Sequence, residues 1–308
     1  MRDRACASWV GLAEEEEGFV FLTGDLGFRA LEPLRDKLGA RFINAGVAEQ
    51  NMVSVAAGLA AEGLACWVYS IAPFCYARPY EQIRNDVCQH GLPVRLVGNG
   101  GGYAYGAMGA THHALEDYGS LLALPGMRAI IPAFRGDVDE AIRQTAGCSG
   151  PVYLRLGRCE APAGWTPPPF TAWRRLVAGD AGVLIAVGPL AGPIVAALQA
   201  RPERSRPSLW ALGELPLVAG DLPEGLVADI ERSRALVVAE EHVATGGAGE
   251  ALAGRLLESG VTVGRFEHVA ARGYPSGRYG SQAWHRRECG LDAESLLARV
   301  AALQSRVA

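Results

Sequence analysis

The chain has 308 residues, of which 49% are hydrophobic and 20% charged, and its formal net charge is −4. This composition is typical of a globular protein large enough for two domains, and it excludes a disordered or fibrous chain. The slightly acidic balance also argues against nucleic acid as a partner, because nucleic-acid-binding domains carry a basic face.

The seven cysteines are odd in number, and no two of them form a Cys-x-x-Cys pair. This pattern predicts neither a zinc site nor a disulfide framework, and free thiols are typical of a reducing cytosol. The segment from Met1 to Cys6 lacks the apolar run of a signal peptide, and no uncharged apolar stretch reaches membrane-spanning length. We therefore expect a cytoplasmic protein without a membrane segment.

Short apolar runs alternate with longer segments rich in Ala and Leu along the chain. Apolar strands separated by helical segments are typical of parallel α/β layers. The sequence therefore predicts an α/β fold of two domains, each a largely parallel sheet flanked by helices. The expected strands are, in chain order, Phe19–Leu22, Pro93–Gly98, Arg128–Ile131, Pro151–Leu156, Val183–Val187, Leu209–Leu212, Ala235–Ala239 and Val261–Phe266.

A helix is expected after Glu49. Met52, Val55, Ala56 and Leu59 follow i, i+3, i+4, i+7 spacing, so this stripe is predicted to face a core. Glu49 would then stand at the helix N-terminus, at the carboxyl edge of a strand, where open α/β sheets bind ligands.

A proline-rich stretch divides the chain near its middle. Three consecutive prolines there remove backbone donors and hold the chain extended, which suits a linker. We expect a first domain over residues 1–161, a linker over residues 162–172 and a second domain over residues 173–308.

A series of motifs follows one another along the chain: Thr23–Leu26, Phe42–Asn51, Arg78–Asp86, Gly109–Asp117, Leu124–Met127, Ile131–Ala133, Ala239–His242, Gly246–Gly249 and Gly290–Ala293. In this order the motifs resemble the transketolase superfamily, which includes transketolases and deoxyxylulose-phosphate synthases. The resemblance covers nearly the whole chain. It implies that the first domain is a pyrimidine-binding domain for thiamine diphosphate and that the second is the family's C-terminal domain.

The resemblance also implies a partner subunit. The family holds the cofactor's diphosphate through Mg²⁺, using a Gly-Asp-Gly segment and a later Asn on an additional domain, and this chain contains no Gly-Asp-Gly. We expect the metal ligands on a separate diphosphate-binding subunit, so that this chain is the C-terminal subunit of a split transketolase, a transferase of small-molecule sugars. Self-association through both domains would give an α2β2 assembly.

By the same resemblance, Glu49 is the carboxyl that bonds the pyrimidine ring of the cofactor. A carboxyl there favours the imino form of the ring, whose exocyclic nitrogen takes the proton from the thiazolium carbon. The protein thus positions the cofactor, and the cofactor itself carries out the bond-forming and bond-breaking steps. We expect Val47, Ala48, Met52 and Val53 to form an apolar setting that favours the protonated carboxyl. Local sequence alone leaves open a Glu that stabilises the helix N-terminus.

Three further residues are expected at the cofactor. Phe74 lies where the family places an aromatic ring against the pyrimidine, and stacking suits a flat heteroaromatic group. Ile71 is placed beside it, and Tyr76 is a weaker candidate for the aromatic role. Asp25 would orient the loop or contact the cofactor. The alternatives are a core side chain for Phe74 and a turn cap for Asp25.

The substrate-side candidates come from the same motifs. His112 occupies the family's Thr-His-Gln position, where a His faces the substrate oxygens and stabilises charge or moves a proton. His113 replaces the usual Gln. Transketolases hold the sugar phosphate with an Arg at about the position of Arg158, since a guanidinium fork suits phosphate. Asn99 is a further candidate, and a structural role is the alternative for each.

The sequence departs from the family at the donor site. Ala107 and Met108 stand where transketolases carry acidic residues, one of which binds a donor hydroxyl, and Gly100 stands where many carry a His. Met108 would contact the donor but is too weak an acceptor for that hydroxyl, and an unpaired buried hydroxyl costs about 1–3 kcal/mol. The resemblance therefore implies a specialised two-carbon ketol transfer, on a modified or nucleotide-linked sugar.

Two alternatives stay open. The β subunit of a 2-oxo acid dehydrogenase or decarboxylase has the same two-domain plan and also needs a partner, although the segment Thr111–His112 favours the transketolase branch. A non-catalytic regulatory or binding subunit is the second alternative, and the presence of Glu49 argues against it.

Overall fold

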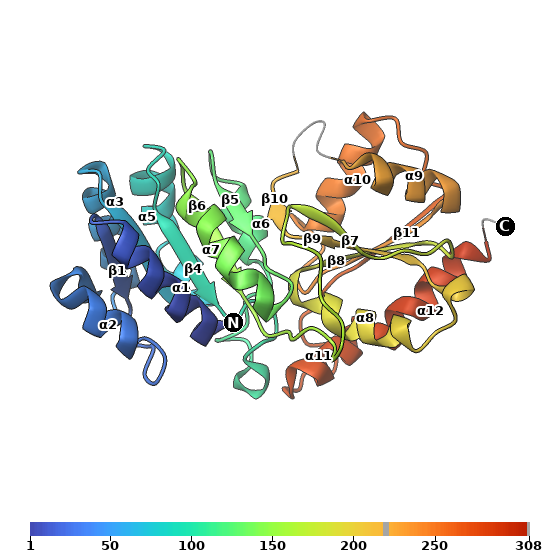
Figure 1. The fold of residues 1–308 in the computed structure, drawn as a ribbon, viewed down its shortest axis with the longest axis horizontal. Coiled ribbons are helices and arrows are strands. Elements are labelled where there is room, and N and C mark those ends of the chain that lie inside the picture. Colours follow the sequence, from blue (N-terminus) through green and yellow to red (C-terminus); the bar gives the residue numbers. More distant parts are fainter. Residues whose placement is uncertain (218–221, 307–308) are drawn as a thin grey trace.

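Two β-sheets organise the chain in the computed structural model, which describes residues 1–217 and 222–306 (Figure 1). The first sheet has seven strands in the order β10-β5-β6-β4-β3-β1-β2, and its pairs are parallel except for β10 with β5. Its strands are β1 (Phe19–Thr23), β2 (Phe42–Asn44), β3 (Ala65–Ile71), β4 (Arg95–Asn99), β5 (Arg128–Ile130), β6 (Val152–Leu156) and β10 (Glu214–Leu215).

The second sheet has five strands in the order β12-β11-β8-β9-β7, and its pairs are parallel except for β7 with β9. Residues 157–172 contain no helix or strand and connect β6 to β7. The strands of this sheet are β7 (Trp173–Val177), β8 (Val183–Val187), β9 (Ser208–Leu212), β11 (Ala235–Ala239) and β12 (Arg265–Val269).

Helices cover both faces of the first sheet, whose inner strands are buried along their length because both faces are packed. One face carries α1 (Arg2–Glu15), α2 (Glu32–Leu38) and α7 (Val138–Ala146). The other face carries α3 (Glu49–Ala61), α4 (Ala72–Tyr76), α5 (Tyr80–Gln82) with the π-helical turn Ile83–Cys88, and α6 (Asp117–Leu122).

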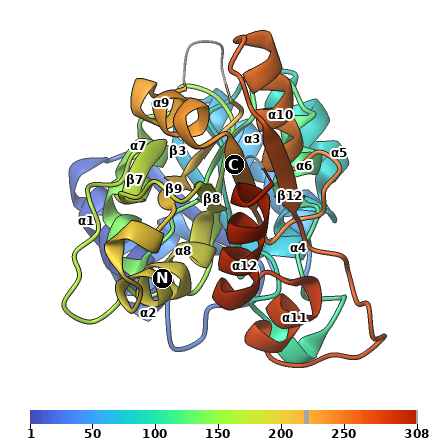
Figure 2. The same ribbon diagram turned by 90° about the vertical axis from the view of Figure 1, so that its right-hand side faces the viewer.

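The second sheet is covered in the same way. One face carries α9 (Glu224–Ser233) and α10 (Ala248–Glu258), and the opposite face carries α8 (Ala191–Gln199) and α12 (Ala293–Gln304) (Figure 1). The remaining helix, α11 (Gln282–Cys289), lies below α12 in Figure 2 and contacts the 3₁₀ turn Gly106–Met108 of the first half of the chain. The expected fold class of two α/β units with largely parallel sheets is therefore confirmed.

Two details of the expected elements were wrong. The last predicted strand, Val261–Phe266, is displaced, because Val261 and Val263 pack on the core from the loop and the strand itself is Arg265–Val269. Four strands were not among those listed as expected: β2, β7, β10 and β3, which lies between β1 and β4 in the sheet.

The buried stripe of α3 also differs from the prediction. Val55 is 39% exposed and Leu59 is only partly buried, whereas Val53 and Ala57 lie in the core beside Met52. The contact face is therefore rotated relative to the predicted stripe, and it combines Met52 and Val53 with the alanines Ala56, Ala57 and Ala60.

One hydrophobic cluster joins the two halves of the molecule. It runs from α3 and α6 of the first half to β8, α9 and α10 of the second, and it includes Tyr118, Leu121, Trp210 and Leu226. Within the described residues, no helix is long and apolar enough to cross a membrane. The seven cysteines form no disulfide, and six of them are buried.

Candidate active site

The carboxyl ends of the parallel strands bring the candidate residues to one edge of the first sheet. In the strand register, Thr23 lies opposite Asn44, and Ile71 lies opposite Asn99. The loops that follow these strands carry most of the side chains singled out from the sequence. This is the edge at which open α/β sheets bind ligands.

Glu49 is the first residue of α3 and is only 5% exposed. Its Oε1 atom accepts a hydrogen bond from Nη1 of Arg78 at 2.8 Å. Of the residues expected to give Glu49 an apolar setting, Met52 and Val53 are fully buried, whereas Val47 is 76% exposed and the Arg78 guanidinium faces the carboxylate.

Phe74 and His112 complete this group. The Arg78 guanidinium lies over the Phe74 ring, 3.9 Å from its centroid, and the His112 ring meets Phe74 edge-on with centroids 5.4 Å apart. Ile71 ends β3 directly before α4, which carries Phe74, and is partly buried. The structure thus brings Glu49, Phe74 and His112 together around Arg78.

On its other side, His112 contacts a tyrosine. The His112 and Tyr105 ring centroids are 5.7 Å apart, and Nδ1 of His112 lies 2.9 Å from Oγ1 of Thr111. Asn99 donates a hydrogen bond from Nδ2 to the Tyr105 hydroxyl at 2.9 Å. Asn99 and His112 are therefore connected through Tyr105, which the sequence did not single out.

Asp25 lies in the loop after β1 and is exposed. Its Oδ1 accepts a hydrogen bond from Nδ2 of Asn44 at 3.0 Å, and its backbone N–H donates to Oδ1 of the same amide at 3.1 Å. The Asn44 amide also accepts from the backbone of Gly46 at 2.9 Å. These bonds tie the loop after β1 to the segment that leads into Glu49.

A cavity of about 750 Å³ opens beside Tyr105. Asn99 and Gly100 line it from the end of β4, Arg158 lines it from the segment after β6, and Arg135 lines it from the turn after β5. Arg158, which the sequence analysis proposed for phosphate binding, shares this cavity with two further guanidinium groups, those of Arg2 and Arg135, and with the carboxyl groups of Asp3 and Glu160.

His113 does not join this group. It is 4% exposed, its Nδ1 lies 2.9 Å from the Tyr274 hydroxyl, and its Nε2 lies 2.8 Å from the carbonyl of Gly106. Burial lowers the pKa of His113 to about 4, so the ring is neutral at neutral pH. Met108 is also apart: it is 56% exposed and is not among the residues that line the cavity. The structure therefore shows neither His113 nor Met108 in the group formed by Glu49, Phe74, Arg78 and His112.

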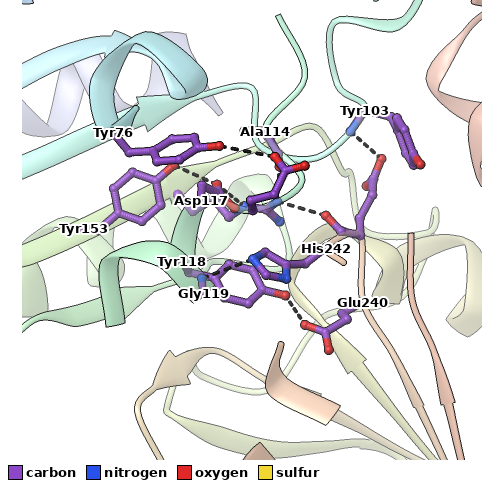
Figure 3. Close-up of polar contacts among 12 residues, drawn as sticks. Tyr76, Tyr103, Ala114, Asp117, Tyr118, Gly119, Tyr153, Glu240 and His242 are labelled. Carbon is purple, nitrogen blue, oxygen red and sulfur yellow. Dashed lines mark hydrogen bonds and ion pairs between the residues drawn. The ribbon is translucent and has the colours of Figure 1, made fainter. Parts of the chain in front are cut away.

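The loop that carries His112 is held by a buried network between the two halves of the chain (Figure 3). Tyr153 and Arg155 donate to Oδ2 of Asp117 at 2.8 and 2.7 Å. The same guanidinium donates to the backbone carbonyls of Ala114 at 2.9 Å and Glu241 at 3.0 Å. Because Ala114 follows His112 by two residues, this network fixes one end of the loop.

The second half of the chain supplies the other members of this network (Figure 3). The Tyr118 hydroxyl donates to Glu240, and the His242 ring stacks on Tyr118 with centroids 3.9 Å apart. The backbone of Gly119 donates to Nε2 of His242 at 3.1 Å, and that of Tyr103 donates to Glu241 at 2.9 Å. These side chains join the two domains and lie apart from the Glu49 group.

Comparison with known proteins identifies the family. A family model described as "Transketolase, pyrimidine binding domain" matches residues 8–163, which is half of the chain. The chain belongs to the transketolase family. Proteins of this family use thiamine diphosphate, so the resemblance expected from the motifs is confirmed.

Two named proteins are similar to most of the chain. It is 28% identical over 276 residues to a subunit of the apulose-4-phosphate transketolase of Actinobacillus succinogenes, covering 87% of this chain and 86% of that protein. It is 32% identical over 314 residues to the 1-deoxy-D-xylulose-5-phosphate synthase 2 of Geobacter sulfurreducens, covering 96% of this chain but 47% of the synthase. The chain thus spans about half the length of that transketolase-family enzyme.

A solved structure described as "Split gene transketolase, inactive beta4 tetramer" is similar over nearly the whole fold. The TM-score is 0.80 at 26% identity, and the match covers 99% of this chain and 97% of that chain. This likeness supports the interpretation of the chain as a C-terminal transketolase subunit.

The contacts of Arg78 test whether the pyrimidine of thiamine diphosphate fits between Glu49 and Phe74. The guanidinium is flat and rich in nitrogen, and it stacks on one side chain while donating to the other. An aminopyrimidine would make the same two contacts with its face and its edge. Oγ of Ser70 is buried without a partner among the described residues, and it lies 3.8 Å from where a Cβ on Gly24 would stand. The residues present therefore fit the pyrimidine end of the cofactor.

Across residues 1–217 and 222–306, no three His, Cys, Asp or Glu side chains gather in a way that could hold a metal ion.

The residues that sequence reasoning missed are Arg78, Tyr105 and Arg135. Arg78 begins one of the family motifs, so its sequence position was a usable signal. Nothing local marks Tyr105 or Arg135, because each reaches the site only through the way its loop folds back on the sheet edge.

Proposed function

We propose that this chain is the pyrimidine-binding subunit of a split thiamine-diphosphate-dependent enzyme that transfers a two-carbon ketol unit between sugar-type substrates. The observation that carries the proposal is the buried Glu49 carboxylate, paired with a flat nitrogen-bearing group that stacks on Phe74. The similarity to named transketolase subunits supports the same reaction class.

Bound thiamine diphosphate would supply the nucleophilic carbon that attacks the donor carbonyl. Glu49 would share a proton with a ring nitrogen of the pyrimidine, and its burial keeps water from competing for that hydrogen bond. Phe74 would support the face of the ring. Asp25 would hold the loop after β1 in place through Asn44.

On the substrate side, His112 is the group proposed to bond the substrate oxygens. In the described part of the chain its Nδ1 is engaged by Thr111, which leaves Nε2 to bond or exchange a proton with an oxygen. Arg158 and Arg135 lie in the neighbouring cavity, and two guanidinium groups suit a phosphate or diphosphate at the far end of a sugar. We propose a donor other than an ordinary ketose phosphate, because Ala107 and Met108 offer no acceptor for a donor hydroxyl.

The diphosphate and Mg²⁺ are proposed to bind on a separate subunit that carries the Gly-Asp-Gly segment, with this chain at the core of an α2β2 assembly in the cytoplasm. Exposed apolar side chains in the loop after β1 and around the start of α3 support a contact surface there: Phe28 is 79% exposed, Val47 76% and Val55 39%. Large apolar side chains in water next to a site are typical of an interface.

The interface is tested by Val47→Asp. We expect this substitution to shift the assembled complex to smaller species in analytical ultracentrifugation, because a carboxylate would be buried without a partner. The matched control is Leu257→Asp, since Leu257 is 80% exposed on α10. An unchanged sedimentation profile for Val47→Asp would place the interface elsewhere.

The reaction is tested with the complex of this chain and its diphosphate-binding partner. We expect ketose formation that depends on added thiamine diphosphate and that falls about 10²- to 10⁴-fold in Glu49→Gln. Glu62→Gln, at the exposed C-terminal end of the same helix, is the control and should keep full activity. A Glu49→Gln complex as active as the parent would leave only a binding role for this subunit.

A further inference from the structure

Tyr105 and Gly100 are fitted to each other at the mouth of the 750 Å³ cavity. Gly100 has a φ of +79°, and a Cβ built on it would stand 2.2 Å from Cε2 of Tyr105. Only glycine leaves the space that the aromatic ring fills, and only glycine readily adopts that backbone conformation. The ring is therefore held in one position above the end of β4.

The phenol of Tyr105 is prepared as a hydrogen-bond donor. Nδ2 of Asn99 donates to its oxygen, so the phenolic proton remains available for an acceptor in the cavity. Burial raises the pKa of Tyr105 above its ordinary value, which keeps the group protonated near neutral pH. The Tyr105 ring also contacts the His112 ring, with centroids 5.7 Å apart, and Tyr105 itself lines the cavity.

The neighbouring side chains do not offer a neutral hydrogen-bond donor to a substrate hydroxyl. Ala107 has no polar side-chain atom, and Met108 is exposed and outside the cavity lining. Arg135 and Arg158, which also line the cavity, are cations and suit an anion. Tyr105 with Asn99 is thus the neutral polar pair next to His112.

We propose that Tyr105, oriented by Asn99, donates a hydrogen bond to the hydroxyl oxygen of the two-carbon unit that the enzyme transfers, and so determines which donor is used. The inference rests on the proposed ketol transfer. It makes Tyr105 the specificity-determining residue and Asn99 a positioning residue that acts through it.

The test compares two donors in the assembled complex with glyceraldehyde 3-phosphate as acceptor. Hydroxypyruvate carries the hydroxyl in question, and pyruvate is the same donor without it. We expect Tyr105→Phe, which keeps the ring, to lower kcat/KM about 10- to 100-fold for hydroxypyruvate and no more than about threefold for pyruvate. Thiamine diphosphate affinity and the unfolding midpoint should not change.

Asn99→Ala supplies the second measurement. Because Asn99 acts through the phenol, its effect on hydroxypyruvate should disappear in the Tyr105→Phe background, so that the double variant equals Tyr105→Phe alone. Equal losses on both donors, or additive losses in the double variant, would overturn the proposal. Failure of the proposed function is distinct, since it would appear as equal turnover in the parent and Glu49→Gln complexes.

Discussion

The Asp117–Arg155 network and the Glu49–Arg78 pair are both carboxylate–guanidinium contacts, yet they are built differently. In the first, the two side chains are 0% and 3% exposed, and the guanidinium also bonds two backbone carbonyls. In the second, the carboxylate is 6% exposed but the Arg78 side chain is 45% exposed. The buried contact fixes the two domains against each other, whereas the open contact can be exchanged for a ligand.

This difference follows from what surrounds each pair. Asp117 and Arg155 lie where the two halves of the chain meet, so water cannot replace either partner. Glu49 lies at the edge of one sheet with exposed apolar residues around it, where a second chain or a cofactor can complete the surface. This arrangement, closed between the domains and open at the strand edge, is compatible with the proposed active site between subunits.

The largest expected effect is from Arg155→Leu. It leaves Asp117 buried and without its cation, and such a loss costs about 3–5 kcal/mol. Urea unfolding of the chain measures the change in free energy. The control is Arg143→Ala, whose partner Glu140 is on the same exposed helix face and whose loss should cost less than about 0.5 kcal/mol. Equal costs for the two substitutions would contradict the distinction between buried and exposed pairs.

A smaller effect on the free energy of unfolding is expected when the pH is lowered and His113 becomes protonated. Its pKa is lowered to about 4 in the folded chain, against an ordinary value of about 6.5, so between these values the unfolded chain binds more protons. Stability is therefore retained above pH 6.5 and lost as the pH falls toward 4, by up to about 3 kcal/mol. His113→Gln should remove this part of the pH dependence. A variant with the same acid profile as the parent would show that His113 is not the titrating group.

The smallest effect is expected from Arg78→Gln. Because the Arg78 side chain is 45% exposed, its ion pair should contribute no more than about 1 kcal/mol to the free energy of unfolding. Thermal unfolding of the chain alone measures this. A loss as large as that of Arg155→Leu would mean that Arg78 is a structural residue and does not give way to a ligand.

The sequence predicted the fold class and the position of Glu49 because both depend on local pattern: apolar runs set the strands, and a motif at the start of α3 sets the carboxylate. Phe74 and His112 were also predicted from motifs, and the structure brings them into contact. The buried face of α3 was misjudged at Val55, because the core-facing positions are taken by Val53 and by alanines, which a pattern of large apolar residues does not pick out.

Other features depended on contacts between distant segments. His113 is buried against Tyr274, which follows it by 161 residues, and no local sequence pattern predicts that contact. The fit of Tyr105 over Gly100 requires the loop after β4 to fold back on its own strand. Such partners are set by the tertiary structure, which explains why the substrate side of the site was predicted less completely than the cofactor side.

The most direct test of the account is a structure of the assembled complex with thiamine diphosphate bound. We expect the pyrimidine to lie between Glu49 and Phe74, with a carboxylate-to-nitrogen distance of about 3 Å and with Arg78 moved off the Phe74 ring. A complex in which Glu49 faces solvent, or in which Arg78 still covers Phe74 while the cofactor lies elsewhere, would contradict it.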